Sequence, residues 1–376
     1  MPTLETGGAE RTTVDVAAAL VREDFTSLVV TSGGRMVTEL MTTGAECIEM
    51  PVHRKSPDAL IANTLRIGRI IRMWNVKLVH ARSRAPAWSA FVAARRAEIP
   101  FVTTYHGIYN AKNGVKRFYN SVMARGDAVI ANSEWTARHI AAEYAFQPRR
   151  LRVIPRGVDL RRFDPETVSR QRIDALRARW GVREGDTVIL LPGRLTRWKG
   201  QAVLIRALGK LKRSGGLENV KAVLAGDPQG RSRYQSELED LAYSRDLGGA
   251  LVIVGHVVDM PAAYLAADIV VSASTDPEGF GRIAAEASAM GRPVIATNHG
   301  GSREIVLPGR SGVLIDPDDP TSLAAALGEL LAAPPEVRTR MGDAARSHIR
   351  SNFTVERMCA DTIALYRELL QNPISA

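Results

Sequence analysis

The sequence predicts an α/β protein of two domains, each built around a parallel β-sheet. Three observations lead to this prediction. The chain has 376 residues, which is too long for one ordinary hydrophobic core. Its composition, 45% hydrophobic and 24% charged, is ordinary for a soluble globular protein. Short apolar runs alternate with helical stretches along the chain, as they do in parallel βαβ units.

Five strands are expected in each half of the chain. In the first half, apolar runs predict strands at residues 28–31, 77–80, 101–104, 128–131 and 151–154. In the second half they predict strands at 188–191, 222–225, 251–254, 269–272 and 294–297. Helices are expected between most of them, for example at 10–21, 60–74, 202–212 and 234–243, and a last helix at 355–370. Ligands of open α/β sheets bind beyond the carboxyl ends of the strands, so a cleft between two such sheets is the expected active site.

The boundary between the halves is marked by turn-forming residues. The sequence Pro-Arg-Gly-Val-Asp at 155–159 suits an inter-domain hinge. The chain start is unusual, because Gly7-Gly8 before a helix resembles a turn that should follow a buried strand. Residues 1–6 do not read as an apolar strand, so we expect the first strand to be missing and the native start to lie upstream of Met1.

The net charge of +10 is concentrated in the first half of the chain. Residues 1–156 hold 22 Lys and Arg against 13 Asp and Glu, whereas residues 157–376 hold 28 against 27. This asymmetry indicates an anionic partner, such as membrane headgroups, an acidic acceptor or nucleic acid, or else solvated basic faces. The two cysteines, Cys47 and Cys359, have no metal-ligand spacing, which argues against a zinc site or a disulfide framework. With no membrane span and no signal-peptide pattern in the sequence, the cytoplasm is the expected compartment.

The strongest candidate binding segment is Asp-Pro-Glu-Gly-Phe-Gly-Arg-Ile-Ala-Ala-Glu at 276–286. It follows a predicted strand and leads into a helix. Gly279 and Gly281 let backbone amides approach a ligand, and the helix N-terminus behind them favours phosphate. Glu278 can accept hydrogen bonds from sugar hydroxyls, and Glu286 can reach ribose hydroxyls. The alternative is a helix whose dipole alone favours acidic residues near its start.

The second candidate segment is the loop after the predicted strand 188–191. A buried pyrophosphate needs its charge neutralised, and Arg194 and Lys199 could clamp it from this one loop. We expect Arg197 to point to solvent and Trp198 to pack rather than bind. The alternative is a solvated loop that happens to hold three cations.

Together, these two segments resemble the large retaining glycosyltransferase family 4. The resemblance rests on Gly193-Arg194 with Lys199-Gly200, and on Glu278-Gly279-Phe280-Gly281 with Glu286. Further matches are 154–159 with Phe163, Gly300-Gly301 with 304–306, Gly312, 7–11 and 105–107. They cover the whole chain except the missing first strand.

The resemblance implies a fold and a division of labour. The fold is GT-B, in which two Rossmann-like domains with parallel sheets face a central cleft. Residues 1–157 would bind the acceptor, 158–353 would bind the nucleotide sugar, and 354–376 would form a helix that packs back on the N-terminal domain.

The resemblance also implies roles for single residues. Arg194 and Lys199 would bind the donor diphosphate, Glu278 the sugar hydroxyls and Glu286 the ribose. The diphosphate would also meet the backbone of Phe280, Gly281, Arg282 and Ile283, and the nucleobase would be lined by Val254, Gly255 and His256. His106 would lie near the reactive end of the sugar, with Glu278 as the other catalytic residue, and Gly8 would approach the phosphate.

The implied reaction is transfer with retention of configuration. Prearranged cations and amides would stabilise the leaving nucleoside diphosphate, so no metal and no cofactor is expected. The leaving phosphate would take the acceptor proton in a front-face attack. The acidic run at 316–319 superficially resembles a metal motif, but its place between a strand and a helix indicates turn and capping chemistry.

A membrane-facing surface is expected after His106. Lys112, Lys116 and Arg117 alternate with aromatic residues, a combination favoured at membrane interfaces. The stretch 65–74 is a second candidate, although its apolar face could simply pack on the sheet. We therefore expect a lipid-linked or glycan acceptor at the cytoplasmic face of the membrane, such as an intermediate of the lipopolysaccharide core.

Other functions remain open at this point. A sugar-nucleotide epimerase of the same fold would use the same donor site. A basic nucleic-acid-binding protein is a different class, but the sequence has no zinc spacing, recognition-helix signature or aromatic RNA-binding motif. We expect no nucleic-acid partner. The nucleobase (uridine or guanosine), the sugar, the acceptor and the oligomeric state cannot be derived from these residues.

Overall fold

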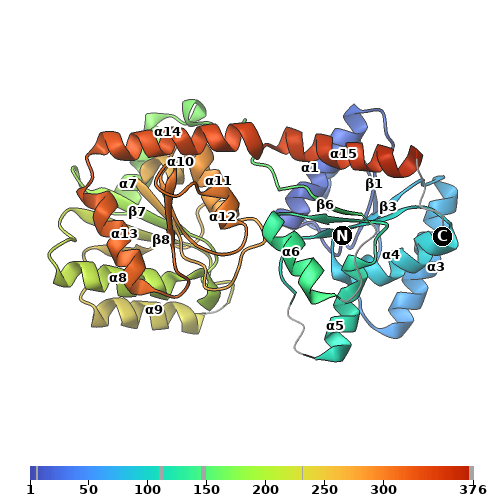
Figure 1. Cartoon of the computed structure of the whole chain (residues 1–376), viewed down its shortest axis with the longest axis horizontal. Helices are drawn as coiled ribbons and strands as arrows, with labels where there is room; N and C mark the ends of the chain where they lie inside the picture. The colour runs from blue at the N-terminus through green and yellow to red at the C-terminus, as the bar shows by residue number, and fades with distance from the viewer. Residues whose placement is uncertain (6, 110–112, 145–149, 231, 372–376) are drawn as a thin grey trace. The chain divides into compact units, whose positions relative to one another are not determined.

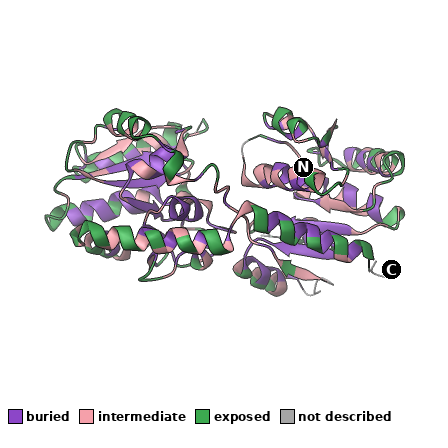
Figure 2. Ribbon diagram, turned by 90° about the horizontal axis from the view of Figure 1, so that it is seen from above, coloured by how far each residue is buried: buried purple, intermediate pink, exposed green. Residues whose placement is uncertain are grey.

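The computed structural model describes residues 1–5, 7–109, 113–144, 150–230 and 232–371. These residues form two compact units, one of residues 1–157 and 355–376 (unit 1) and one of residues 158–354 (unit 2). Each unit has parallel strands at its centre and helices around them (Figure 1). The strands are largely buried, and exposed residues lie mainly on the outer faces of the helices (Figure 2).

Unit 2 holds one six-stranded parallel sheet in the order β12-β11-β10-β7-β8-β9. The strands are β7 (Thr187–Pro192), β8 (Val220–Ala225), β9 (Leu251–Ile253), β10 (Ile269–Ser272), β11 (Val294–Thr297) and β12 (Gly312–Ile315). The helices are α7 (Arg170–Arg179), α8 (Gln201–Arg213), α9 (Ser232–Ser244), α10 (Met260–Ala266), α11 (Arg282–Ala289), α12 (Ser302–Ile305), α13 (Pro320–Ala332) and α14 (Pro335–Asn352).

Helices cover both faces of this sheet because its strands are apolar on both sides. Along β7, Val188 and Leu190 pack with residues of α10, α11 and α14, whereas Ile189 and Leu191 pack with residues of α8, α9 and α13. This two-sided burial is typical of parallel sheets. The chain reverses its direction of strand addition between β7 and β10, which are hydrogen-bonded neighbours. This switch point is where open α/β sheets bind ligands.

Unit 1 holds two parallel sheets, β1-β2 and β3-β4-β5-β6. The strands are β1 (Leu28–Thr31), β2 (Glu46–Glu49), β3 (Val79–Ala81), β4 (Phe101–Tyr105), β5 (Ala128–Ala131) and β6 (Leu151–Val153). The helices are α1 (Gly8–Arg22), α2 (Val37–Thr42), α3 (Pro57–Met73), α4 (Arg84–Arg96), α5 (Gly114–Ser121), α6 (Glu134–Glu143) and α15 (Val355–Gln371).

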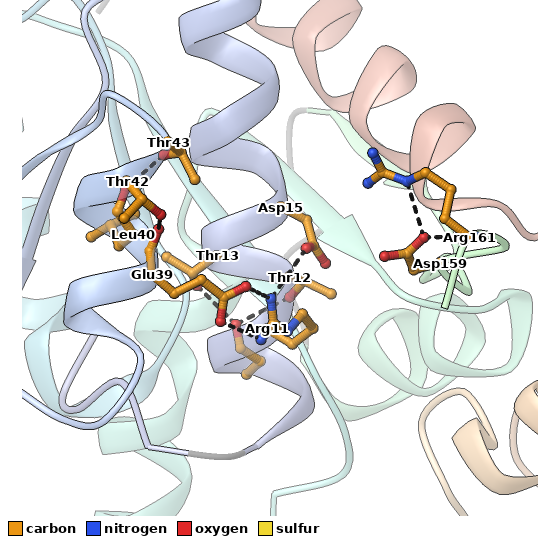
Figure 3. Close-up of polar contacts among 11 residues, drawn as sticks. Arg11, Thr12, Thr13, Asp15, Glu39, Leu40, Thr42, Thr43, Asp159 and Arg161 are labelled. Carbon is orange, nitrogen blue, oxygen red and sulfur yellow. Dashed lines mark hydrogen bonds and ion pairs between the residues drawn. The ribbon is translucent and has the colours of Figure 1, made fainter. Parts of the chain in front are cut away.

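Helices from both ends of the sequence pack together in unit 1. Residues of α1 and α15 form one hydrophobic cluster with β4 and β5, and residues of α3 and α4 form another on the opposite face of β4. At the surface, Arg11 of α1 pairs with Asp15 on its own helix and with Glu39 of α2 (Figure 3). The pair between Arg11 and Glu39 links α2 to α1.

The sequence-based strands agree with the structure in place and in parallel direction, with ends that differ by up to two residues. The expectation for β3 begins two residues early, at Lys77. The sequence gives no prediction of β2, a four-residue strand with Glu46 and Glu49 exposed at its ends. Its charges hide the apolar alternation that marks a strand. The acidic run behaves as expected, because Asp319 caps α13 by accepting a hydrogen bond from the Thr321 amide at 2.7 Å.

Candidate donor site and family

The loops after β7 and β10 bring their polar residues together at the switch point of unit 2. Lys199 lies in a short 3-10 helix (Arg197–Lys199) after β7, and Glu278 lies in the loop after β10. The Lys199 Nζ is 2.7 Å from Glu278 Oε1, and each side chain is only 11% exposed. Ser274 donates its hydroxyl to the same carboxylate oxygen at 2.5 Å. The structure therefore joins the two segments that the sequence analysis treated separately.

The electrostatics of this pair favour the charged form of the carboxyl. Burial acts to raise the pKa of Glu278, but the Lys199 ammonium and the hydrogen bonds from Lys199 and Ser274 outweigh it. They hold the pKa below its ordinary value. A buried, hydrogen-bonded ion pair of this kind offers a cation for phosphate oxygens and an anion for sugar hydroxyls within one small volume.

Close backbone packing fixes the position of Glu278. The Gly301 amide donates to the Glu278 carbonyl at 2.8 Å. A Cβ on Gly300, whose φ is +62°, would lie 2.3 Å from that same carbonyl oxygen. Only glycine fits there without a backbone shift. The motif Gly300-Gly301 thus acts on the site by letting the chain after β11 pass directly over Glu278.

The side chain of Gln201 holds the loop after β7 in place. This buried side chain donates from Nε2 to the carbonyl of Arg194 at 2.9 Å. Arg194 itself is exposed at the surface of unit 2. Arg197 is 73% exposed and pairs with Glu237 at 2.5 Å, as expected for a residue directed to solvent. Trp198 is half-buried, and the Lys199 ammonium lies 4.4 Å from its ring centre.

The helix α11 begins directly behind this pair. Gly281 is its N-cap residue with φ +89°, and Phe280 is buried against Phe353. The first amides of a helix have no acceptor within it and point out of its N-terminus, and Arg282 and Ile283 carry the first two of α11, directly after Phe280 and Gly281. They supply the partial positive charge that favours a phosphate.

Glu286 lies one turn into α11 and is almost fully buried. Tyr264 donates to its Oε2 at 3.0 Å, and Arg282 donates to its Oε1 from Nη2 at 2.6 Å and from Nε at 3.1 Å. Burial first, and the Glu286 charge second, raise the pKa of Tyr264 well above its usual range, so the phenol stays a hydrogen-bond donor. The carboxylate of Glu286, which is the residue predicted to bind the ribose, is therefore oriented by Tyr264 and Arg282.

The predicted nucleobase segment lies elsewhere along the same edge of the sheet. Val254 continues from β9 and bonds through its amide to the Leu224 carbonyl at 3.0 Å. Gly255 follows with φ +69°, where an added Cβ would meet no atom within 4 Å, and His256 is exposed.

Ser274 and His299 also contribute to the site and were not predicted. Ser274 bonds to Glu278, and His299 lies close enough to help lower the pKa of that carboxyl. The His299 ring bonds through Nε2 to the Thr275 carbonyl at 3.2 Å. Both residues follow the ends of central strands, at 272 and 297, and this position was the signal that could have identified them.

In unit 1, His106 directly follows β4. Arg156 donates from Nη2 to His106 Nδ1 at 3.0 Å, and Asn132 donates to the His106 carbonyl at 3.1 Å. A guanidinium can only donate, so Nδ1 is the acceptor and the ring proton belongs on Nε2. Burial, then Arg156, Arg82 and His80, lower the pKa of His106 well below its usual value. His106 is thus a neutral hydrogen-bond donor at neutral pH.

The other predicted residues of unit 1 lie in two places. Gly8 is the first residue of α1. Lys116 and Arg117 lie on α5 and are exposed, with Arg117 Nε 3.1 Å from Glu143. Lys112 lies outside the described residues. The second candidate for membrane contact, residues 65–74, is partly buried, because Ile67 and Ile71 of α3 belong to the hydrophobic core.

Fold and site together define the class: an α/β protein with the N-terminus of α11 and a buried Lys–Glu pair at the switch point of a Rossmann-type sheet. Two family models match the chain, one described as Glycosyltransferase Family 4 over residues 6–162 and one as Glycosyl transferases group 1 over residues 172–348. The chain belongs to the family 4 glycosyltransferases and has the GT-B fold.

Individual relatives agree with this membership. The chain is 30% identical over 370 residues to a D-inositol 3-phosphate glycosyltransferase of Geodermatophilus obscurus, covering 94% of this chain and 80% of the relative. It is 32% identical to the protein of that name from Salinispora tropica, covering 82% and 67%.

Solved structures extend the likeness to three dimensions. A glycosyltransferase from Rickettsia africae ESF-5 is 33% identical with a TM-score of 0.89, over 99% of this chain and 98% of the other. Anabaena Alr3699/HepE, solved in complex with UDP-glucose, is 25% identical with a TM-score of 0.82, over 97% and 98%. The chain is therefore an enzyme that transfers glycosyl groups.

Proposed function

We propose that this glycosyltransferase takes a sugar from a uridine or guanosine diphosphate sugar and transfers it, with retention of configuration, to a lipid-linked or glycan acceptor. The observation that carries the donor assignment is the buried Lys199–Glu278 pair beside the start of α11. A structural role for this pair alone would not require it to lie where open sheets bind ligands.

In this proposal the donor binds to Lys199 and Glu278 in place of the contact that these two side chains make with each other. Lys199 and Arg194 bind the diphosphate together with the backbone amides of 280–283. Glu278 accepts hydrogen bonds from the sugar hydroxyls and Glu286 accepts them from the ribose. The segment 254–256 lines the nucleobase, and Gly8 approaches the phosphate.

The chemistry follows from these roles. The bond between the anomeric carbon and the β-phosphate oxygen breaks, and a bond from that carbon to the acceptor oxygen forms on the same face. The acceptor proton passes to the leaving phosphate. Lys199 and the α11 amides stabilise the charge that develops on that phosphate, so these groups supply the stabilisation that a metal would otherwise provide. His106, neutral and protonated on Nε2, donates a hydrogen bond to the transferred sugar.

Uridine diphosphate is the favoured leaving group. The support is the HepE relative, 25% identical over 97% of this chain, which was solved with UDP-glucose. Guanosine diphosphate is the alternative donor nucleotide.

The acceptor proposal rests on the α5 surface, defined here as Val115, Lys116, Arg117 and Phe118. Val115 is 81% exposed and Phe118 is 61% exposed, beside the two cations. Phe118 stacks on Trp88 with ring centres 5.2 Å apart, which holds it in a fixed orientation. Exposed apolar residues among cations suit the headgroup region of an anionic membrane, where each cation contributes about 1 kcal/mol. No helix among the described residues is long and apolar enough to cross a membrane.

A phosphorylated small-molecule acceptor is a second candidate, favoured by a different observation. Arg82 is 8% exposed, and its Nε has no hydrogen-bonding partner among the described residues. Its Nη2 donates to the Thr12 hydroxyl at 2.9 Å, and its charge helps to lower the pKa of His106. The relatives' name, D-inositol 3-phosphate glycosyltransferase, is consistent with an anionic acceptor at such a site.

The donor site is tested by comparing two single substitutions on one loop, one of a lysine and one of an arginine. Lys199→Ala removes the buried cation, and Arg197→Ala removes an exposed cation two residues away. We expect Lys199→Ala to lower sugar transfer by about tenfold or more, since a hydrogen bond to a charged group contributes about 1.5–3 kcal/mol. Arg197→Ala should leave transfer within about twofold, as exposed ion pairs contribute little.

Ligand binding is measured separately by thermal stabilisation with uridine, guanosine and adenosine diphosphates. A ligand at about 100 times its dissociation constant adds about 2.7 kcal/mol of stability. We expect one nucleotide to stabilise the wild type and the Arg197→Ala variant, and to lose most of its effect on Lys199→Ala. Equal activity and equal stabilisation in all three proteins would refute the donor assignment.

A further inference from the structure

Arg82 of unit 1 is a buried cation that is hydrogen-bonded to uncharged groups. It directly follows β3 and is 8% exposed. Its Nη2 donates to the Thr12 hydroxyl at 2.9 Å, and this hydroxyl donates in turn to the Ala9 carbonyl at 3.1 Å. The guanidinium also bonds to the hydroxyl of Tyr366 in α15. Within the described part of the chain, no carboxylate forms a hydrogen bond with this charge.

A series of hydrogen bonds fixes Arg82 from the side of α15. A guanidinium can only donate, so the Tyr366 oxygen accepts from it and the Tyr366 proton goes to His80 Nδ1. His80 then carries its own proton on Nε2 and donates it to the Thr104 hydroxyl at 2.7 Å. Burial first, and then Arg82, lower the pKa of His80 well below its usual value, so the ring is neutral as this series requires. The Arg82 side chain is therefore held in place before any ligand binds.

Arg82 and His106 lie on the same face of the sheet. Alternate residues along a strand point to the same face. Arg82 comes two residues after His80, and His106 comes two residues after Thr104 on the neighbouring strand β4. The hydrogen bond between His80 and Thr104 shows that these two faces coincide. Burial, Arg156 and then Arg82 lower the pKa of His106, which agrees with this placement.

Two hydrogen-bond donors in this place have no acceptor among the described residues. They are Arg82 Nε and His106 Nε2, and both atoms are buried. The Nε of a guanidinium always carries a proton, and His106 Nε2 carries one because Nδ1 accepts from Arg156. Buried polar groups in proteins are nearly always paired. The partners that these two donors require are therefore acceptor oxygens of a ligand.

The charge around His106 is positive. Arg156 Nη2 lies 3.0 Å from His106 Nδ1, so two guanidinium groups, those of Arg156 and Arg82, act on one neutral imidazole. The carboxylate that acts on Arg82 is Asp15, which lies 3.9 Å from another cation, Arg11. A phosphate monoester carries a charge of about −1.5 to −2 at pH 7, whereas a carboxylate carries a single negative charge. Phosphate thus matches the two guanidinium groups better.

We propose that the acceptor of this enzyme carries a phosphate monoester, and that Arg82, assisted by Arg156, binds this phosphate at the carboxyl ends of β3 and β4. His106 keeps its Nε2 proton for the transferred sugar. The inference rests on the proposed function and names the chemical group by which unit 1 would recognise the acceptor. Either a free sugar phosphate or a phosphorylated lipid would present this group.

A binding role for Arg82 and a purely structural role predict opposite effects on stability. Burial lowers the pKa of Arg82, so the fold stabilises the charged guanidinium less than water does. Arg82→Gln removes this charge and keeps an N–H donor for Thr12. If Arg82 serves a ligand, the unliganded variant should melt at the same temperature as the wild type or higher. A clear fall in melting temperature is the result expected of a structural residue.

The binding experiment uses nuclear magnetic resonance of the protein labelled with nitrogen-15 arginine and histidine. The Nε–H signal of Arg82 is identified by its loss in Arg82→Lys, and the ring signals of His106 give a second readout that the arginine variants retain. Inorganic phosphate and glycerol 1-phosphate are the probes, and acetate and chloride at equal ionic strength are the comparisons. Arg35→Gln is the control, because the Arg35 side chain lies in the same unit and is 83% exposed.

We expect both phosphate probes to shift the signals of Arg82 and His106 in the wild type and in Arg35→Gln. Arg82→Gln should weaken this binding by about tenfold or more, since a hydrogen bond from a charged donor is lost. An equal response to acetate and chloride, or no response to phosphate, would overturn the proposal. A fall in the melting temperature of unliganded Arg82→Gln together with unchanged phosphate binding would overturn it as well.

Vesicles distinguish the two sources of the phosphate. If vesicles of phosphatidic acid shift the Arg82 signal and glycerol 1-phosphate binds far more weakly, the phosphate belongs to a lipid. If glycerol 1-phosphate binds at least as well, it belongs to a soluble acceptor. Both results support the site, whereas a failure of both probes contradicts it.

Thermal stabilisation by uridine diphosphate on the same proteins separates this inference from the proposed function. That stabilisation depends on Lys199 in the proposed donor site, and the Arg82 signal reports on unit 1 alone. A phosphate response at Arg82 without nucleotide stabilisation would count against the donor proposal and leave the phosphate site supported. Nucleotide stabilisation without a phosphate response at Arg82 would overturn only the phosphate site.

Discussion

The change Lys199→Met isolates the electrostatic contribution of the candidate donor site to stability. Methionine keeps most of the length of lysine but cannot carry its charge. In the wild-type protein the two charged groups are 2.7 Å apart and each side chain is 11% exposed. Removing one partner from a buried pair of this kind costs about 3–5 kcal/mol, because the other charge is left uncompensated.

The sign of the pH dependence distinguishes this mechanism from loss of packing. The pKa of Glu278 in the folded wild type is below its ordinary value, so its contribution to stability is present at neutral pH and is lost as the pH falls through the folded pKa. In Lys199→Met, burial acts without the ammonium and should raise the pKa of Glu278. The uncompensated charge is then relieved by protonation at low pH.

The assay is urea unfolding of both proteins between pH 8 and the most acidic pH at which they stay folded. We expect the wild type to be more stable by about 3–5 kcal/mol near neutral pH, with a gap that narrows as the pH falls through the raised pKa of Glu278 in the variant. The double variant Lys199→Met with Glu278→Gln is the control, and it should show a smaller gap that does not vary with pH. A gap for Lys199→Met that stays the same at every pH would refute the reasoning.

Two further predictions concern Glu278 and the α5 surface. Gly300→Ala should lower both stability and sugar transfer, because the added Cβ would lie 2.3 Å from the Glu278 carbonyl oxygen. Gly309→Ala is the matched control, because Gly309 also has a positive φ, +73°, but an added Cβ there meets open space. Equal losses in the two variants would show that only backbone strain matters. Replacing Lys116 and Arg117 by Ser should weaken binding to anionic liposomes by about thirtyfold, since each cation contributes about 1 kcal/mol. Unchanged sedimentation with the liposomes would contradict the membrane role.

The sequence predicts most of the candidate donor site because the information is local. Gly281, before a helix and after an apolar run, already indicates a close approach of backbone and phosphate, and Glu278 and Lys199 each stand in a recognisable segment. Their ion pair cannot be derived from local sequence, because 79 positions separate the two residues along the chain. It depends on β7 and β10 being neighbours, which only the strand order of the sheet establishes.

Residues with ordinary neighbours in the sequence were missed for the same reason. Gln201 begins a helix, and nothing in that position shows that its amide holds the Arg194 carbonyl. Arg156 was interpreted as part of a hinge, whereas its guanidinium sets the tautomer of His106. β2 was missed because its sequence carries charges at both ends, so its pairing with β1 was visible only in the fold.

The arrangement around Glu286 has a consequence for how fast a nucleotide can leave. Two Arg282 nitrogens already satisfy one oxygen of this carboxylate, and Tyr264 binds the other. Ribose hydroxyls that bind Glu286 would therefore replace contacts rather than create them, and Arg282, whose side chain is 42% exposed, is the partner that can swing away. As the product departs, the guanidinium can return to the carboxylate step by step. If the nucleotide binds here as proposed, such an exchange would limit the affinity for the spent nucleotide and shorten the time for which it occupies the enzyme between turnovers.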